Sequence, residues 1–266
     1  MELLSADRPW RQEYRRLWQQ ERRFLAENRR PRRDALGERL EAHVPRQLAG
    51  TLHGAFVRAF ALVFEKGEGV VQWAGRQQAR EQAYLVRSCQ ADLRGDRRSL
   101  RAFSRAAAAA GRGSVLQAGA QGVGLGLLGI GLPDIPLFTL TLLKGVRETA
   151  VSFGYSGQGP AEQVFTLRLI GTALTQGEEL EAGNRALNRF IQEGAWPEPP
   201  DADRALEDTA RRLSQAMLHW KFLQGIPVAG ALGGAWDAVL LSRVQRYAAI
   251  KYGRRFLIDR KLGRDL

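Results

Sequence analysis

Two aspartates, Asp134 and Asp237, each border an otherwise uncharged and glycine-rich segment, and they are the acids best placed to do chemistry. A carboxylate in apolar surroundings is costly unless a cation or a hydrogen-bond donor accompanies it. We therefore predict a polar cluster around these acids, in which they cap helices or, alternatively, contact a ligand. The predicted members of this cluster are Asp134, Lys144, Arg147, Glu148, Lys221 and Asp237.

The cluster is not accompanied by a recognised catalytic, metal-binding or cofactor-binding motif. The run from Gly124 to Gly129 has the letters of the dinucleotide-binding motif G-x-G-x-x-G, but an alanine-rich helix precedes it where that motif needs a strand. The histidines His43, His53 and His219 lie far apart, without the paired spacing of metal ligands. We predict no catalytic residue, no metal and no cofactor.

Two apolar segments rich in glycine, near residues 114–143 and 223–237, are predicted to form helical hairpins. Small residues let helix backbones approach closely, both in membranes and in soluble cores. The stretch from Ser114 to Leu132 is uncharged, and a helix of about 20 apolar residues can cross a bilayer. A buried core helix is the favoured interpretation, and a membrane span or re-entrant membrane contact are the alternatives. The residues predicted to contact a membrane or ligand are Gly122, Gly126, Leu127, Leu128, Ile130, Gly230 and Gly234.

The chain is strongly basic, with a formal net charge of +12, and its arginines concentrate at both ends. Such surfaces attract phosphate backbones and anionic lipid headgroups equally well. An arginine-rich surface that is merely solvated is the simpler alternative. The residues predicted to contact an anionic surface are Arg246, Lys251, Arg254 and Arg255.

Length and composition indicate one large hydrophobic core rather than several domains. Cys89 is the single cysteine, so an intramolecular disulfide is excluded and a reducing compartment is favoured. The first residues lack the apolar segment of a signal peptide. We therefore expect a cytoplasmic protein, or one peripheral to the inner face of the membrane.

Apolar residues recur at spacings of three and four, and no stretch alternates as a strand would. The sequence predicts an all-α, bundle-like domain of about ten helices. An arginine-rich amphipathic helix or arm is expected over residues 1–34, and the main helical domain over 35–266. The expected helices are 1–30, 45–66, 70–89, 93–110, 114–132, 137–154, 160–176, 178–193, 202–223 and 236–259.

Several of these segments, in this order, resemble the EcsC family. They are the apolar run that closes on Leu132-Pro-Asp-Ile-Pro136, the helix that ends Glu148-Thr-Ala-Val-Ser-Phe-Gly-Tyr155, the segment from Lys221 to Asp237, and a last helix through Ala248, Tyr252, Arg255 and Phe256. The resemblance covers about residues 40–260. It implies a bacterial helical protein associated with membranes or with an ABC transporter, and it supplies no catalytic residue.

The first functional hypothesis is therefore a membrane-peripheral protein that binds lipid or a membrane protein, such as an ABC transporter, through its glycine-rich segments. A nucleic-acid-binding protein is one alternative, although the aromatic residues follow apolar stripes rather than the basic clusters. An enzyme with a polar site around Asp134 is another, although no nucleophile and base have a diagnostic spacing.

Overall fold

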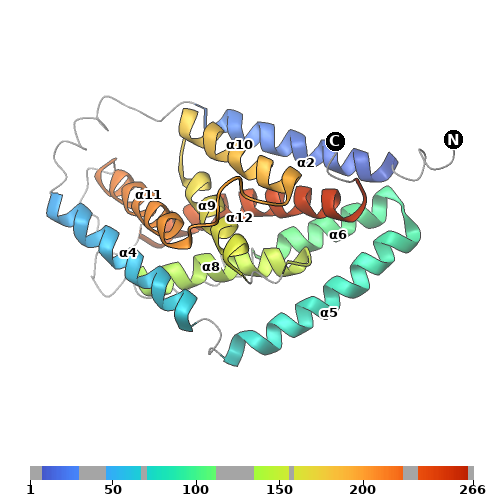
Figure 1. Ribbon diagram of the computed structural model, residues 1–266, viewed down its shortest axis with the longest axis horizontal. Coiled ribbons are helices and arrows are strands. Elements are labelled where there is room, and N and C mark those ends of the chain that lie inside the picture. Colours follow the sequence, from blue (N-terminus) through green and yellow to red (C-terminus); the bar gives the residue numbers. More distant parts are fainter. Residues whose placement is uncertain are drawn as a thin grey trace.

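A computed structural model describes residues 8–29, 46–66, 71–111, 135–155, 159–223 and 233–262 of the chain. These residues form nine α-helices and one short π-helix, without a strand among them, which confirms the all-α prediction for this part of the chain. The elements are α2 (Arg8–Glu27), α4 (Arg46–Lys66), α5 (Val71–Arg94), α6 (Arg97–Ala110), α8 (Ile135–Ser152), α9 (Pro160–Leu174), α10 (Gly177–Glu193), α11 (Ala202–Leu223), α12 (Gly233–Leu257) and η1 (Ile258–Leu262) (Figure 1).

Several helices begin or end at residues that commonly cap or terminate a helix. The Asp96 carboxylate accepts a hydrogen bond of 2.7 Å from the backbone N–H of Ser99, and so caps the first turn of α6. Pro160 occupies the first turn of α9, where its missing N–H costs nothing. Gly194 ends α10 with a φ of 74°, in the left-handed conformation that glycine adopts without strain.

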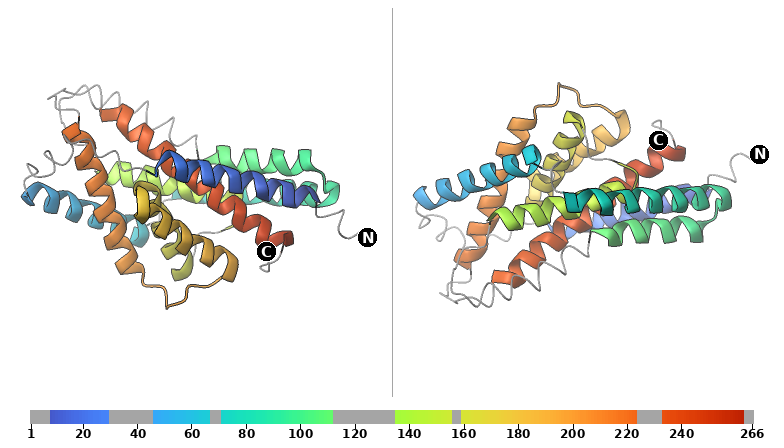
Figure 2. Two further views of the ribbon diagram at one scale, coloured as in Figure 1. Left: turned by 90° about the horizontal axis from the view of Figure 1, so that it is seen from above. Right: turned by 90° about the horizontal axis from the view of Figure 1, so that it is seen from below.

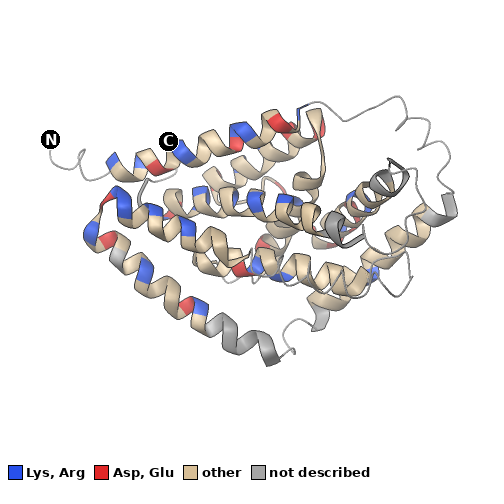
Figure 3. Cartoon of the chain, turned by 180° about the vertical axis from the view of Figure 1, so that it is seen from behind, with Lys and Arg blue, Asp and Glu red and all other residues tan. Residues whose placement is uncertain are grey.

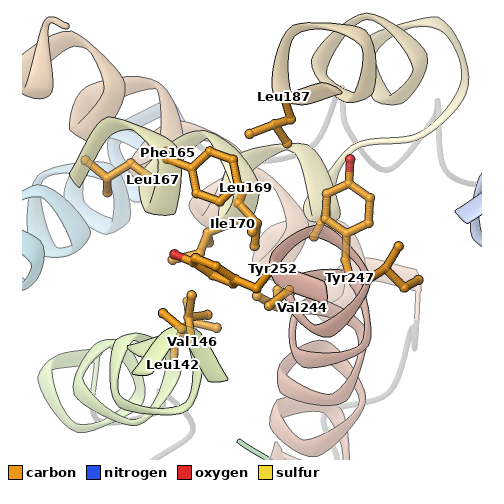
Figure 4. Close-up of a cluster of buried hydrophobic side chains, with 14 of the residues drawn as sticks. Leu142, Val146, Phe165, Leu167, Leu169, Ile170, Leu187, Val244, Tyr247 and Tyr252 are labelled. Carbon is orange, nitrogen blue, oxygen red and sulfur yellow. The ribbon is translucent and has the colours of Figure 1, made fainter. Parts of the chain in front are cut away.

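Helix α12 is the centre of the fold. It packs against α2, α6, α8, α9 and α10, and Figure 2 shows α2 crossing over it. The core around α12 includes Val146 of α8, Phe165 of α9 and Leu187 of α10, which surround Val244 and Tyr252 (Figure 4). Helix α11 packs on α9 and α4, and α4 in turn packs on α8. One core therefore joins helices from both ends of the chain.

Helix α2 belongs to this core. Its Trp10, Leu17 and Phe24 are buried, and Trp10 and Phe24 stack on Phe256 and Tyr247 of α12. The predicted boundary after residue 34 therefore does not separate a detached arm from the rest. The helix is amphipathic, as predicted, and the α12 residues that cover its apolar side lie more than 200 residues away along the chain.

Helix α8 approaches α12 closely at Gly145. A Cβ atom at this position would lie 2.2 Å from the side-chain amide of Gln245, which fills the space. The Thr149 hydroxyl, one turn further along α8, donates to the carbonyl of Gly145 at 3.1 Å. A glycine in α8 thus lets a polar side chain of the central helix lie against its backbone.

Candidate functional site

Part of the predicted site lies outside the residues that the structure describes. This applies to Asp134, Gly122, Gly126, Leu127, Leu128, Ile130 and Gly230. For three more predicted residues, which belong to α11 and α12, the structure describes only the helical backbone: Lys221, Gly234 and Asp237. The roles predicted for these residues, either in a polar cluster or in contact with a membrane or ligand, stay predictions.

The described members of the predicted polar cluster lie on α8. Glu148 is 6% exposed, and its carboxylate forms an ion pair of 2.8 Å with Arg80 of α5. Lys144 and Arg147 are half-buried on the same helix. Glu148 was predicted to belong to a polar cluster, but its partner Arg80 was not, because the pairing depends on how α5 packs against α8.

The basic residues of α12 do not form the exposed surface that we predicted. Arg246 is exposed and pairs with Glu27 of α2 at 2.6 Å, but Lys251 is fully buried and Arg254 is 3% exposed. Arg255 is half-buried. Lys251 and Arg254 therefore do not lie on an exposed surface, contrary to the prediction, because α12 crosses the middle of the core and directs both side chains towards α2 and α10.

Glu21 of α2 holds these two buried cations. Its carboxylate lies 3.2 Å from Lys251 Nζ and accepts a hydrogen bond from Arg254 Nη1. The amides of Asn184 and Asn188, on α10, donate to Glu21 Oε1 at 2.8 and 2.7 Å. Their oxygens accept from Lys251 Nζ, both at 2.6 Å. We call these five side chains the Glu21 network, which pins together α2, α10 and α12.

Burial and pairing act in opposite directions on the charges of the Glu21 network. Burial opposes the ionisation of Glu21, yet Lys251, Arg254 and the two amides lower its pKa to about 2. Burial lowers the pKa of Lys251 to about 7, although the Glu21 carboxylate counteracts part of that effect. One carboxylate thus faces two cationic side chains, and the network has an excess of positive charge whenever Lys251 is protonated.

A second polar group anchors the end of α12. Arg255 Nη1 pairs with Glu162 of α9 at 2.6 Å, and the Tyr252 hydroxyl donates to the same carboxylate at 3.0 Å. Tyr155 donates to Asp259 at 2.8 Å, and its ring lies 4.0 Å from the Arg255 guanidinium. Burial, followed by the neighbouring carboxylates, raises the pKa of both tyrosines. These contacts provide hydrogen-bond partners for buried polar groups. The Arg255 guanidinium is therefore paired within the fold.

The most unusual surface feature is an apolar stripe on α5, which the sequence analysis missed. Leu85, Val86 and Leu93 are 62%, 58% and 81% exposed, and Cys89 between them is also exposed. An α-helix turns by about 100° per residue, so these four side chains share one side of α5. We call them the α5 stripe.

The α5 stripe lies opposite the side of the helix that faces the core. That inner side carries Ser88 and Ala91, which are buried, and Tyr84, which packs against Phe103 of α6. Helix α5 therefore has apolar residues on two sides, of which the fold uses one. A helix with a second apolar side was detectable in the sequence, but the pattern does not tell which side the core covers.

Arginines border the α5 stripe. Residues 79–111, which span the described side chains of α5 and α6, contain seven arginines against three acidic residues. Arg87, Arg94, Arg97, Arg98 and Arg105 are exposed, and Figure 3 shows the basic positions along both helices. Of the three acids, Asp92 pairs with Arg260 at 2.5 Å and Asp96 caps α6. The surface of this helical hairpin is therefore both apolar and positively charged.

The described residues include no group of three His, Cys, Asp or Glu side chains that could hold a metal ion. None of the described helices combines the length and the apolar character needed to cross a membrane. An apolar stripe bordered by arginines is suited to lie on an anionic interface rather than to pass through it.

Comparison with known proteins identifies a family. The sequence profile of the EcsC protein family matches residues 11–257, which include most of α2 and most of the chain. No curated protein matches the chain significantly. No solved structure does so either.

Proposed function

The chain belongs to the EcsC protein family, and we propose that it is a peripheral membrane protein that binds the anionic inner face of a bacterial membrane through the α5 stripe. Family membership by itself assigns no activity. The proposal is supported by one surface on which exposed apolar side chains and unburied arginines lie together.

The α5 stripe is the observation that carries this proposal. Single exposed apolar residues are ordinary on protein surfaces, whereas contiguous apolar patches mark sites of interaction. Leu85, Val86 and Leu93 lie within about two turns of one helix and are all more than half exposed. Placing them among the acyl chains just below the headgroups would remove this apolar area from water.

The arginines supply the second component of binding. Each basic residue near an anionic leaflet contributes about 1 kcal/mol, and this attraction is screened within a Debye length. Arg87 and Arg94 lie on α5 itself, and Arg97 and Arg98 begin α6 just beyond the turn. A shallow apolar contact together with several arginines favours reversible attachment to anionic lipid over neutral lipid.

The glycine-rich segments keep their predicted role as further contacts with lipid or with a membrane protein, such as an ABC transporter. The α5 stripe consists of described side chains, so membrane binding through it can be tested independently of the glycine-rich segments.

Flotation with liposomes tests the proposed function. The purified full chain is mixed with vesicles of phosphatidylcholine alone, or of phosphatidylcholine and phosphatidylglycerol, at low and high salt. We expect flotation with the anionic vesicles, weakened by high salt but still measurable because the apolar contact persists. Absence of flotation at low salt would overturn the proposal. Complete loss at high salt, together with tight binding to nucleic acid, would indicate a purely electrostatic interaction with phosphates.

A further inference from the structure

A pocket of about 440 Å³ opens above the Glu21 network, between α2, α10 and α12. This volume lies within the range of about 300–1,000 Å³ that small-molecule sites occupy. Four arginines line it, contributed by all three helices: Arg15, Arg185, Arg189 and Arg254. Its described lining includes no aspartate or glutamate. We propose that this pocket binds a phosphomonoester group.

Arg254 gives the pocket a fixed cationic floor. Its side chain is 3% exposed, and it is held by Glu21, by Asn188 at 2.9 Å and by the Tyr14 hydroxyl at 2.8 Å. Its Nε is buried and has no hydrogen-bond partner among the described residues. The contacts with Glu21, Asn188 and Tyr14 immobilise the guanidinium, whose positive charge lies at the base of the pocket.

The rim adds positive charge that the protein does not neutralise. Arg15 is exposed, and no carboxylate among the described residues pairs with it. Arg185 is 72% exposed and lies 3.9 Å from Glu181, at the limit of an ion pair. Arg189 is paired with Glu193 at 2.8 Å. Two rim guanidiniums thus carry charge that an incoming anion can balance.

The charge balance favours a dianion over a monoanion. Below the pocket, the single carboxylate of Glu21 faces both Lys251 and Arg254. Arg15 and Arg185 add two further cations above it. A phosphomonoester carries about −1.5 to −2 charges at neutral pH, and its oxygens match the forked donors of guanidinium groups. A carboxylate brings one charge and fewer acceptor oxygens.

The group bound by the pocket can belong to a free phosphorylated metabolite or to the headgroup of a lipid. Trp18 is 44% exposed and forms one wall, against which the uncharged part of either ligand can pack. The pocket is lined by residues of α2, α10 and α12, and not by α5. Phosphate binding in the pocket and membrane attachment through α5 can therefore be tested independently of each other.

Isothermal titration of the full chain with three ligands tests the assignment. The ligands are glycerol 3-phosphate, short-chain dihexanoyl phosphatidic acid below its micellar concentration, and glycerate as a carboxylate comparator. We expect both phosphomonoesters to bind at least about tenfold more tightly than glycerate, because a second charge-assisted contact is gained. Equal affinity for the two phosphomonoesters identifies a phosphate site for free metabolites, whereas tighter binding of phosphatidic acid identifies a lipid site.

Rim variants locate the binding in the pocket. Arg15→Gln combined with Arg185→Gln removes two exposed side chains, so the fold is kept, and affinity should fall at least about tenfold. Arg211→Gln is the matched control, since Arg211 is 58% exposed, pairs within its own helix with Asp208 and lies outside the pocket. Absence of binding to both phosphomonoesters, equal binding of glycerate, or equal losses in the rim variant and the control would overturn the proposal.

Discussion

Replacing the apolar side chains of the α5 stripe should abolish most of the membrane affinity without unfolding the protein. The perturbation is the triple variant Leu85→Gln, Val86→Gln and Leu93→Gln. These side chains are more than half exposed, so they contribute little to the core. The variant keeps the arginines, and any change in binding therefore reports on the apolar contact.

The structure sets the magnitude of this effect. The exposed fractions of the three side chains, 62%, 58% and 81%, add up to the equivalent of two exposed side chains. Complete burial of a leucine or valine side chain stabilises by about 1.5–3 kcal/mol, so insertion of the stripe contributes at most about 3–6 kcal/mol. Since each 1.4 kcal/mol is a factor of about ten, this limit corresponds to a fall in the partition coefficient of at most about 10²–10⁴-fold.

The assay is a vesicle titration in which bound protein is measured by flotation over a series of anionic lipid concentrations. The matched control is Leu62→Gln with Val239→Gln, which removes two exposed apolar side chains, 43% and 57% exposed, from α4 and α12. The control should bind like the wild type. Wild-type affinity in the triple variant, or an equal loss in the control, would refute the role of the α5 stripe.

Three further predictions concern the structure that supports these surfaces. Glu21→Gln leaves Lys251 and Arg254 buried without a carboxylate, so the free energy of unfolding in urea should fall by about 3–5 kcal/mol, and a loss below about 1 kcal/mol would contradict the network. The buried Lys251 has a pKa of about 7 in the folded protein, whereas the unfolded chain keeps this proton up to about pH 10.4. Unfolding therefore takes up a proton, and from about pH 7 to about pH 10 the stability of the wild type relative to Lys251→Met should rise with pH, by up to about 1.4 kcal/mol per unit; a flat difference would exclude the lowered pKa. Gly154 and Gly159 have φ angles of 92° and 89°, but only at Gly154 would a Cβ atom meet a side chain, the Tyr84 ring at 2.4 Å. Gly159→Ala should therefore cost about 1 kcal/mol of backbone strain in thermal or urea unfolding, and Gly154→Ala at least about 1 kcal/mol more; equal losses would show that Tyr84 moves aside freely.

Most helices of the described chain could be predicted from local patterns. The predicted helix over residues 202–223 has the same bounds as α11, and the helix predicted from 45 to 66 begins one residue before α4. Proline and glycine mark these ends physically, because proline lacks the N–H that a helix interior needs and glycine ends a helix in the left-handed conformation. The expected helix over 70–89 ends five residues too early, since residues 90–94 continue α5.

The tertiary partners of charged residues could not be predicted in this way. Lys251 and Arg254 look like surface residues in a basic segment, and their carboxylate, Glu21, lies more than 200 residues earlier. Glu148 likewise pairs with Arg80 on another helix. These charged side chains are paired only because α12 packs against α2 and α8 packs against α5. Local composition indicates how many charges a segment carries, but not which of them the fold will pair.

The exposure of the α5 stripe could not be predicted for a related reason. Apolar residues in a helix are expected to face inward, and nothing in the local pattern distinguishes Leu85, Val86 and Leu93 from core residues. Among the described elements, helix α5 packs mainly against α6 and α8, which cover one side of it. The other side of α5 is exposed because no further helix in the described part of the chain packs closely against it. The sequence of α5 does not determine how many helices pack around it.

Cys89 offers the most direct test of the proposed function, because it lies within the α5 stripe and is the single cysteine of the chain. The wild-type protein can be labelled there with an environment-sensitive NBD fluorophore, without any substitution. Membrane attachment through α5 predicts a blue shift and an intensity increase on anionic vesicles, with quenching by spin-labelled lipids and protection from aqueous iodide. An unchanged spectrum on vesicles that nevertheless bind the protein would show that α5 faces water, and would contradict the proposed orientation.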